Sequence, residues 1–357
     1  MRDLLGQMLE LLPDRALALA RIVDRTGAGP RETGAAMAVT AHGRVLGSLS
    51  GGCVESAVLT TAGQVLLDGH AHLERFAAAD DLAVGLPCGG EIEVFVERLD
   101  HSDLPALRAL DSALRAHHPV AYATTLESTP DRKLLRPGDC RPWRGLDRDA
   151  AALLDAGHSG LIGAQECTPA QADRPRTFVQ VFRSPARMIL AGANDYTRAV
   201  TVAAANLGYH VTVVDARETF TTPARFPVAD EVVVDWPHRY LDSEHTAGRI
   251  DDRTVVCVLT HDPKFDVPLL VSALRLTAVG FLGALGSRRA HADRTRRLRE
   301  AGLTDREIAR IRSPLGLDLA AHTPEETAIS ILAQVLADRA NASARPLSTL
   351  SGPIHPR

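Results

Sequence analysis

The chain has 357 residues, of which 45% are hydrophobic and 24% charged, and its formal net charge at pH 7 is −4. At about 150 residues per domain this length predicts two or three domains, and the composition is that of an ordinary globular protein. The slight acidic excess argues against a general nucleic-acid partner. No apolar run approaches the roughly 20 residues of a membrane span, so we expect no membrane partner.

The beginning of the chain and the cysteines indicate a compartment. The segment Met1–Gln7 contains Arg2 and Asp3 and becomes polar too early for a signal peptide, so we expect a cytoplasmic protein. The five cysteines are widely spaced and form no CxxC pair. This pattern predicts neither a disulfide framework nor a zinc site, and each cysteine is then a small hydrophobic side chain or a working thiol.

Residues 1–184 are expected to form a small α+β domain that carries cysteines. Apolar alternation and helical spacing separate the strands from the helices in this part of the chain. We expect strands over 16–23, 35–40, 44–48, a half-exposed 91–97, 120–125 and 177–182, helices over 54–67 and 104–117, and a loop over 132–148.

Residues 185–340 show a regular alternation of strands and helices, which predicts a doubly wound, Rossmann-like domain with a parallel sheet. The polar, proline-bearing segment 183–187 is the expected domain boundary, and residues 341–357 are expected to be a flexible tail. The expected strands are 188–191, 211–214, 231–234, 254–259 and 278–282, with a helix over 195–207 after the first of them.

The first turn of this domain has the layout of a dinucleotide site but lacks two of its glycines. Asp215 follows Gly192 by 23 residues, close to the roughly 20 that place an acid on a ribose hydroxyl. Asn194 and Thr197 replace the second and third glycines, and Asp195, expected to cap the helix, would repel a phosphate. We therefore favour a retained fold element over an NAD(P) site, with a weak or altered nucleotide site as the alternative.

Two further segments lie at the same edge of the predicted sheet. His261 follows a buried strand and could line a pocket, although a histidine there is as often a structural hydrogen-bonding group. The strand 278–282 is expected to lead into a glycine turn and then a helix that starts with Ser287, Arg288 and Arg289. A hydroxyl, helix-start amides and two guanidinium groups predict a phosphate site there, since Arg forks match phosphate oxygens.

The most unusual segment is 47–55, where Ser50, Gly51 and Gly52 precede Cys53. A strand ends, a double-glycine bend follows, and a helix is expected to begin near Cys53, so the helix dipole and unpaired amides would favour its thiolate. Glu55 would oppose this unless it points away. Cys88 lies in a second Cys/Gly-Gly loop, 85–90. Each loop alone is more often a tight turn with a buried cysteine, but two of them favour a shared cleft for thiol chemistry.

The sequence resembles a known family. The segment 47–55 is similar to the signature of the XdhC/CoxI family, the accessory factors of xanthine dehydrogenase and carbon monoxide dehydrogenase. The likeness covers most of the chain in order, and its main departure is Asn194-Asp195, where many members keep a second glycine. The other segments that carry it are 86–90, 213–217, 259–263, 283–289 and 314–318.

The resemblance implies a chaperone of the molybdenum cofactor more than a turnover enzyme. Family members bind this cofactor transiently, assist its sulfuration and pass it to a molybdenum hydroxylase, and they tend to be dimers. Carried over by position, Cys53 and Cys88 would handle the molybdenum or its sulfur, as suits a soft nucleophile. Ser287, Arg288 and Arg289 would hold the phosphate of the pterin, and a cysteine desulfurase would be a further partner.

Two other functions compete with this one. An NAD(P)-dependent oxidoreductase would use Asp215 and His261, and the broken glycine pattern argues against it. A docking protein without a cofactor would bind the partner enzyme and be indifferent to loss of Cys53.

Overall fold

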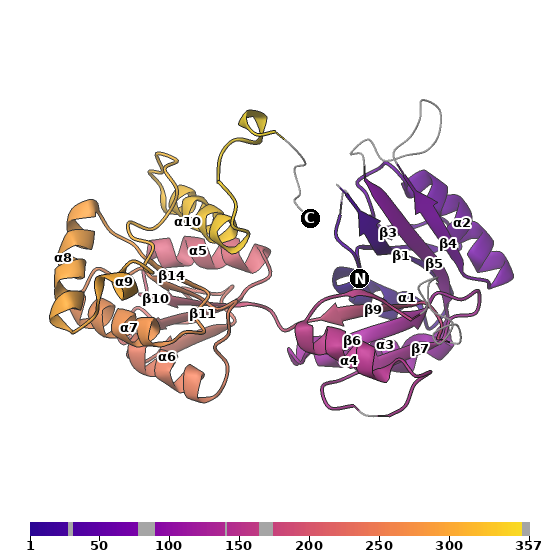
Figure 1. Ribbon diagram of the computed structural model, residues 1–357, viewed down its shortest axis with the longest axis horizontal. Helices are drawn as coiled ribbons and strands as arrows, with labels where there is room; N and C mark the ends of the chain where they lie inside the picture. The colour runs from indigo at the N-terminus through magenta and orange to yellow at the C-terminus, as the bar shows by residue number, and fades with distance from the viewer. Residues whose placement is uncertain (28–30, 78–89, 140, 164–173, 352–357) are drawn as a thin grey trace. The chain divides into compact units, whose positions relative to one another are not determined.

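The computed structural model describes residues 1–27, 31–77, 90–139, 141–163 and 174–351 (Figure 1). Their contacts divide the chain into two compact units, with Met1–Ser184 in the first and Pro185–Leu350 in the second. Each unit has its own sheets and its own hydrophobic core. In the described part of the chain, no helix is both long and apolar enough to cross a membrane.

The first unit contains two antiparallel sheets, with strand orders β3-β2-β1-β5-β4 and β7-β6-β9-β8. The strands are β1 (Leu17–Thr26), β2 (Ala36–Thr40), β3 (Val45–Gly47), β4 (His72–Phe76), β5 (Glu91–Leu99), β6 (Val120–Thr125), β7 (Arg132–Leu135), β8 (Gly160–Ile162) and β9 (Thr177–Phe182). The helices are α1 (Arg2–Leu11), α2 (Glu55–Asp68), η1 (His101–Asp103), α3 (Leu104–Arg115) and α4 (Asp147–Ala156).

Helices cover both sheets of this unit. Helix α2 buries Val58, Ala62 and Val65 against one face of the first sheet, which is the face that its helical spacing predicts. Helices α1 and α3 share a core with the opposite face and with β6 and β9 of the second sheet. Helix α4 packs on the second sheet through Ala150 and Leu154. The α+β class expected for this region is therefore confirmed.

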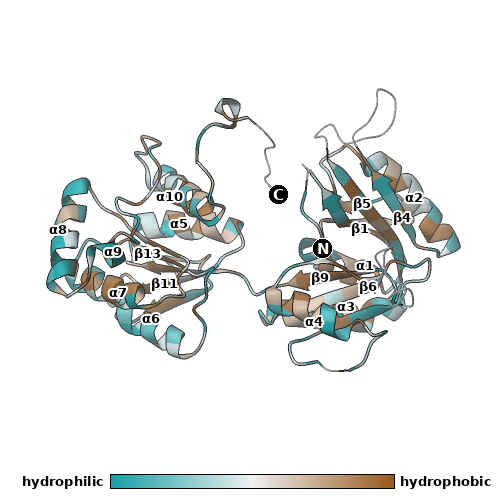
Figure 2. Cartoon of the chain, in the orientation of Figure 1, coloured by the Kyte–Doolittle hydropathy of each residue, from teal (hydrophilic) through white to brown (hydrophobic). Residues whose placement is uncertain are grey.

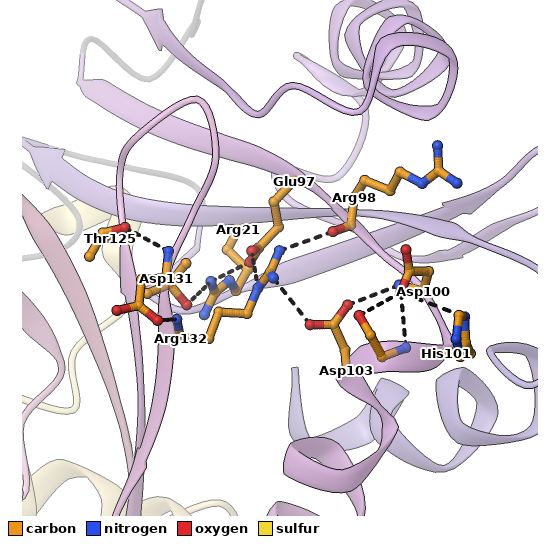
Figure 3. A network of polar contacts seen from close by, with 11 residues as sticks. Arg21, Glu97, Arg98, Asp100, His101, Asp103, Thr125, Asp131 and Arg132 are labelled. Atoms are coloured by element: carbon orange, nitrogen blue, oxygen red, sulfur yellow. Dashed lines mark hydrogen bonds and ion pairs between the residues drawn. The ribbon is translucent and has the colours of Figure 1, made fainter.

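A buried ion network joins the two sheets of the first unit (Figure 3). Arg21 of β1 and Glu97 of β5 are both fully buried and lie 2.5 Å apart, N to O. The same carboxylate accepts a hydrogen bond from Arg132 of β7 at 2.8 Å, and the rings of Tyr122 and Phe178 each lie 5.5 Å from the Arg21 guanidinium carbon. Pairing and aromatic contact offset the desolvation of these buried charges.

Three expectations for this unit need correction. Strand β5 is largely buried because it is paired on both sides and the second sheet covers Glu97. The prediction of a loop over 132–148 is wrong at both ends, because Arg132–Leu135 forms β7 beside β6 and Asp147 begins α4. Helix α1 and strand β4 were not predicted, and α1 is held by the burial of Leu4, Leu5 and Met8.

The second unit has one five-stranded parallel sheet of order β12-β11-β10-β13-β14. This order is that of a doubly wound Rossmann-like sheet, so the predicted fold class is confirmed. The strands are β10 (Arg187–Ala191), β11 (His210–Asp215), β12 (Glu231–Val234), β13 (Val255–Val258) and β14 (Phe281–Ala284). The helices are α5 (Asp195–Asn206), α6 (Pro237–Thr246), α7 (Pro263–Arg275), α8 (Arg288–Glu300), α9 (Asp305–Ile308), α10 (Pro324–Arg339) and η3 (Leu347–Thr349).

Helices lie on both faces of this sheet (Figure 1). Helices α5 and α10 pack on one face with Cys257, and α6, α7 and α8 pack on the other. Figure 2 shows that the strands β11 and β13, which lie between these helix layers, are apolar. It also shows that the surface of α8 is hydrophilic. The last strand differs from its predicted range, since it begins at Phe281 and includes Gly283, against which Leu315 packs.

Candidate functional site

The bend that carries Cys53 is wound around the side chain of Glu55. Five backbone amides and two serine hydroxyls of the segment 48–54 donate hydrogen bonds to this one carboxylate. Oε1 accepts from Ser48 Oγ (2.7 Å), Leu49 N (3.1 Å), Ser50 N (2.8 Å) and Gly51 N (3.0 Å), and Oε2 accepts from Ser50 Oγ (2.5 Å), Gly52 N (2.9 Å) and Val54 N (3.2 Å). Successive amides that converge in this way form an anion-binding nest.

This geometry corrects the expectation for Glu55 and for the amides beside Cys53. Glu55 points into the bend, and the amides that were expected to support a thiolate are bonded to its carboxylate. Burial raises the pKa of Glu55, but the hydrogen bonds from Ser50 and Ser48 outweigh it and hold that pKa well below its usual range. The helix itself begins at Glu55 with Val54 as its N-cap, one residue later than the predicted range 54–67.

Cys53 is half-buried at this bend. Its amide donates to Ser50 Oγ at 2.9 Å, and the residue packs against the core under α2 while part of it stays accessible. Gly51 and Gly52 have φ angles of +82° and +127°, which glycine adopts without strain, and a Cβ at either would meet no atom within 4 Å. Cys88 lies outside the described residues, so the predicted pair of cysteine loops stays a prediction.

In the second unit, side chains of the protein accept hydrogen bonds from amides of the turn after β10. Asp215 accepts from the amide of Ala193 at 2.8 Å and forms two hydrogen bonds with the guanidinium of Arg217, at 2.9 and 2.6 Å. Burial raises the pKa of Asp215, but the bonds from Arg217 and Ala193 lower it below its usual value. The carboxylate is only 2% exposed, so the group expected to meet a ribose is used inside the protein.

The helix after this turn is capped by Asn194, which corrects the expected cap at Asp195. The Asn194 side chain accepts from the amide of Thr197 at 3.0 Å and donates to the Leu259 carbonyl at 2.8 Å. Gly192 is required at this turn, since its φ is +115° and a Cβ would lie 2.9 Å from the Thr260 nitrogen. An NAD pyrophosphate seeks turn amides of this kind, and two of them, those of Ala193 and Thr197, are already bonded to Asp215 and Asn194.

A cavity of about 650 Å³ opens at this edge of the sheet. Ligands bind at such an edge in doubly wound folds, where the strand order reverses. Phe220, 45% exposed, lies close to two cations, with its ring centroid 5.2 Å from the guanidinium carbon of Arg217 and 5.5 Å from that of Arg225. The lining residues are Ala193, Asn194, Asp195, Arg217, Phe220, Arg225, Thr260, His261, Asp262 and Pro263.

The predicted site residues of this unit fall into two groups. His261 lines the cavity beside the turn that contains Gly192, whereas Asp215 supports that turn from within. Ser287, Arg288 and Arg289 are exposed at the start of α8, and the Ser287 hydroxyl accepts from the amide of Ala290 as the helix cap. One helix-start amide of the predicted phosphate site is therefore occupied.

Sequence reasoning missed several residues of these sites. Arg217 belongs to the family segment 213–217 but was given no role, and Phe220 and Arg225 lie outside every segment singled out in the sequence. Only the fold brings the three residues to the cavity. Glu55 was taken for an opposing charge. An acid in the first turn of a helix, after a loop rich in serine and glycine, is a capping pattern, and this signal could have identified its role.

Fold and site define a protein of two α/β units, with a thiol-bearing bend in the first and a Rossmann-like sheet in the second. Comparison with known protein families identifies the family to which the chain belongs. Residues 188–335 match the XdhC Rossmann domain and residues 12–77 match the XdhC and CoxI family. The chain belongs to the XdhC and CoxI family, as its motifs predict.

Three relatives span nearly the whole chain. A protein of Bacillus subtilis (strain 168), named as a probable subunit of xanthine dehydrogenase, is 28% identical over 92% of this chain and 95% of its own length. The molybdenum cofactor insertion chaperone PaoD of Escherichia coli (strain K12) is 28% identical over 92% of this chain and 85% of its own. A crystal structure described as a xanthine dehydrogenase from Bacillus halodurans is 25% identical with a TM-score of 0.72, over 97% of both chains.

Proposed function

We propose that this protein is an accessory factor that binds the molybdenum cofactor and assists its insertion into a molybdenum hydroxylase. The support from comparison is the family and the 28% identity to a chaperone named for insertion of this cofactor. The observation that carries the proposal in the structure is the half-buried Cys53, presented by an ordered bend beside two exposed glycines. A sulfur held in this way can contact a bound molecule without a rearrangement of the backbone that carries it.

The cofactor is here the cargo, and each unit, taken by itself, carries donor groups that suit one part of it. A thiol is a soft group that matches molybdenum and its terminal sulfur, and we assign this contact to Cys53, with Cys88 as its proposed companion. The phosphate of the pterin matches Arg288 and Arg289, whose side chains are exposed at the start of α8. Sulfuration on this chain, with a cysteine desulfurase as donor, belongs to the same proposal.

The partner that we propose is an enzyme of the xanthine dehydrogenase or carbon monoxide dehydrogenase type. It rests on the names of the relatives and on the family. A homodimer and a cytoplasmic location stay predictions from the sequence.

The alternative of an NAD(P)-dependent oxidoreductase has less support. It requires the carboxylate of Asp215 for a ribose and the turn amides for a pyrophosphate. Asp215 is bonded to Arg217 and to Ala193 instead, so binding would have to break both contacts.

Cofactor capture tests the proposed function. The protein is purified from molybdate-fed cells and its bound pterin is oxidised and measured by fluorescence. We expect pterin with the wild-type protein, and a loss of most of it in Cys53→Ala. The matched control is Cys257→Ala, which removes a thiol that is completely buried. Equal pterin in wild type and Cys53→Ala would overturn the assignment of the cofactor contact to Cys53, and absence of pterin from the wild-type protein would leave only a docking role.

A further inference from the structure

We propose that Glu55 is a positioning residue, whose carboxylate holds the bend 48–54 in the one conformation that presents Cys53. This rests on the proposed function of Cys53 and adds a role that the sequence did not suggest. Glu55 does not touch the sulfur through any of the hydrogen bonds described above. It acts through the backbone of the bend and through Ser50.

The donors of the bend converge on a single carboxylate. Amides that point to one place repel each other unless an acceptor lies between them, and an ionised carboxylate is the strongest acceptor that a side chain offers. Both oxygens of Glu55 are used, Oε1 by four donors and Oε2 by three. The carboxylate thus compensates the positive ends of five peptide groups at once.

The carboxylate of Glu55 is itself anchored. Glu55 is the first residue of α2, and α2 is fixed to the sheet by Val58, Ala62 and Val65. On the other side of the bend, Leu49 is fully buried in the same core. The two exposed glycines between these anchors have no side chain to hold them. The Gly52 amide donates to Glu55, and the Gly51 amide donates to Glu55 and also, at 3.1 Å, to Ser48 Oγ. Because the Ser48 hydroxyl itself donates to Glu55, the positions of both amides depend on this carboxylate.

The Ser50 hydroxyl connects the carboxylate to the cysteine. Ser50 Oγ donates to Glu55 Oε2 at 2.5 Å and accepts from the amides of Cys53 at 2.9 Å and Val54 at 3.1 Å. A chain of two hydrogen bonds therefore runs from Glu55 through Ser50 to the Cys53 backbone. Loss of the carboxylate removes the acceptor for the Ser50 hydroxyl and frees the peptide that carries the thiol.

The variants that test this differ in how many donors they can satisfy. Glu55→Ala removes the acceptor entirely. Glu55→Gln keeps the length of the side chain but offers one oxygen, and its NH₂ group is directed at amides that also donate. The matched control is Glu10→Gln, which removes the same charge from an exposed position on α1 in the same unit.

The measurement is the rate at which iodoacetamide alkylates Cys53 in the full, cofactor-free chain, followed on the tryptic peptide 45–75, which contains no other cysteine. Hydrogen exchange of β1 reports the fold of the unit in the same samples. If the bend opens in Glu55→Ala, we expect alkylation to rise by about tenfold or more, with β1 exchange unchanged. Glu55→Gln should lie between Glu55→Ala and wild type, and Glu10→Gln should equal wild type.

Two results would overturn the proposal. One is a Cys53 rate in Glu55→Ala equal to that of wild type. The other is faster exchange of β1 that accompanies the faster alkylation, because Glu55 would then only stabilise the whole unit. Since this experiment needs no cofactor, its outcome is independent of the pterin measurement that tests the proposed function.

Discussion

Asp215 and Arg217 are two residues apart and hold each other by two hydrogen bonds, from Nε to Oδ1 at 2.9 Å and from Nη2 to Oδ2 at 2.6 Å. The same carboxylate accepts from the amide of Ala193 at 2.8 Å. The residue that would bind a ribose in a dinucleotide site therefore closes the turn that would bind the pyrophosphate. Asp215 has the spacing of a ribose ligand, but its carboxylate supports the turn after β10.

The first prediction concerns NAD. We expect isothermal titration of the wild-type protein to show no micromolar binding of NAD or NADP, because a ligand must first break the bonds of Asp215. Asn194→Gly, which restores the second glycine, should not create a site, since Asp215 still holds Ala193. Micromolar binding by either protein would contradict the closed turn. The comparison of the two separates the effect of the glycine from that of the carboxylate.

A second prediction concerns the buried pair of Arg21 and Glu97. Arg21→Met leaves a fully buried carboxylate with Arg132 as its remaining cation, and removal of one partner of a buried pair costs about 3–5 kcal/mol. We expect the free energy of unfolding of the first unit to fall by about this amount in urea titrations followed by Trp143 fluorescence. Arg115→Met, which breaks an exposed pair with Asp111 in the same unit, should change it little. Equal effects of the two substitutions would contradict the network's role.

The third prediction is a pH dependence that comes from Cys257. Burial raises the pKa of this thiol to about 12, from a usual value near 9. Because the unfolded chain then releases the proton first, the stability that the thiol contributes is present below pH 9 and is lost as the pH rises toward 12. We expect the second unit to lose about 1.4 kcal/mol per pH unit in this window relative to Cys257→Ala. Parallel stability curves for the two proteins would rule this out.

The fourth prediction concerns the phosphate end of the cargo. If Arg289 binds this phosphate, Arg289→Ala removes a charge-assisted hydrogen bond, and we expect cofactor capture to weaken by about tenfold or more. Arg296→Ala is the control, since Arg296 is on the same helix and is paired with Asp293 and Glu300. A loss in Arg225→Ala with none in Arg289→Ala would move the phosphate site to the cavity beside Phe220.

The sequence was sufficient where local pattern and burial agree. The parallel sheet followed from buried apolar segments that alternate with helices, and the strands 177–182 and 231–234 have the predicted bounds. Thr323 precedes Glu326 by three residues, the spacing of a capping box at a helix start, and this capping box forms at α10. The family motifs, including the bend at Cys53, are likewise a property of the sequence alone. In each case the signal that predicts the element comes from residues close together in the sequence.

Tertiary structure decided where the charged groups go. Arg132 reads as part of a polar loop, yet it lies in β7 because Glu97, 35 residues away, accepts its hydrogen bond. Asp215 reads as a ribose ligand, yet a nearby amide and Arg217 use its carboxylate. Glu55 reads as a charge that opposes a thiolate, yet seven donors turn it inward. A sequence pattern gives the type and spacing of a charge, but its partner depends on which groups folding brings within a hydrogen bond of it.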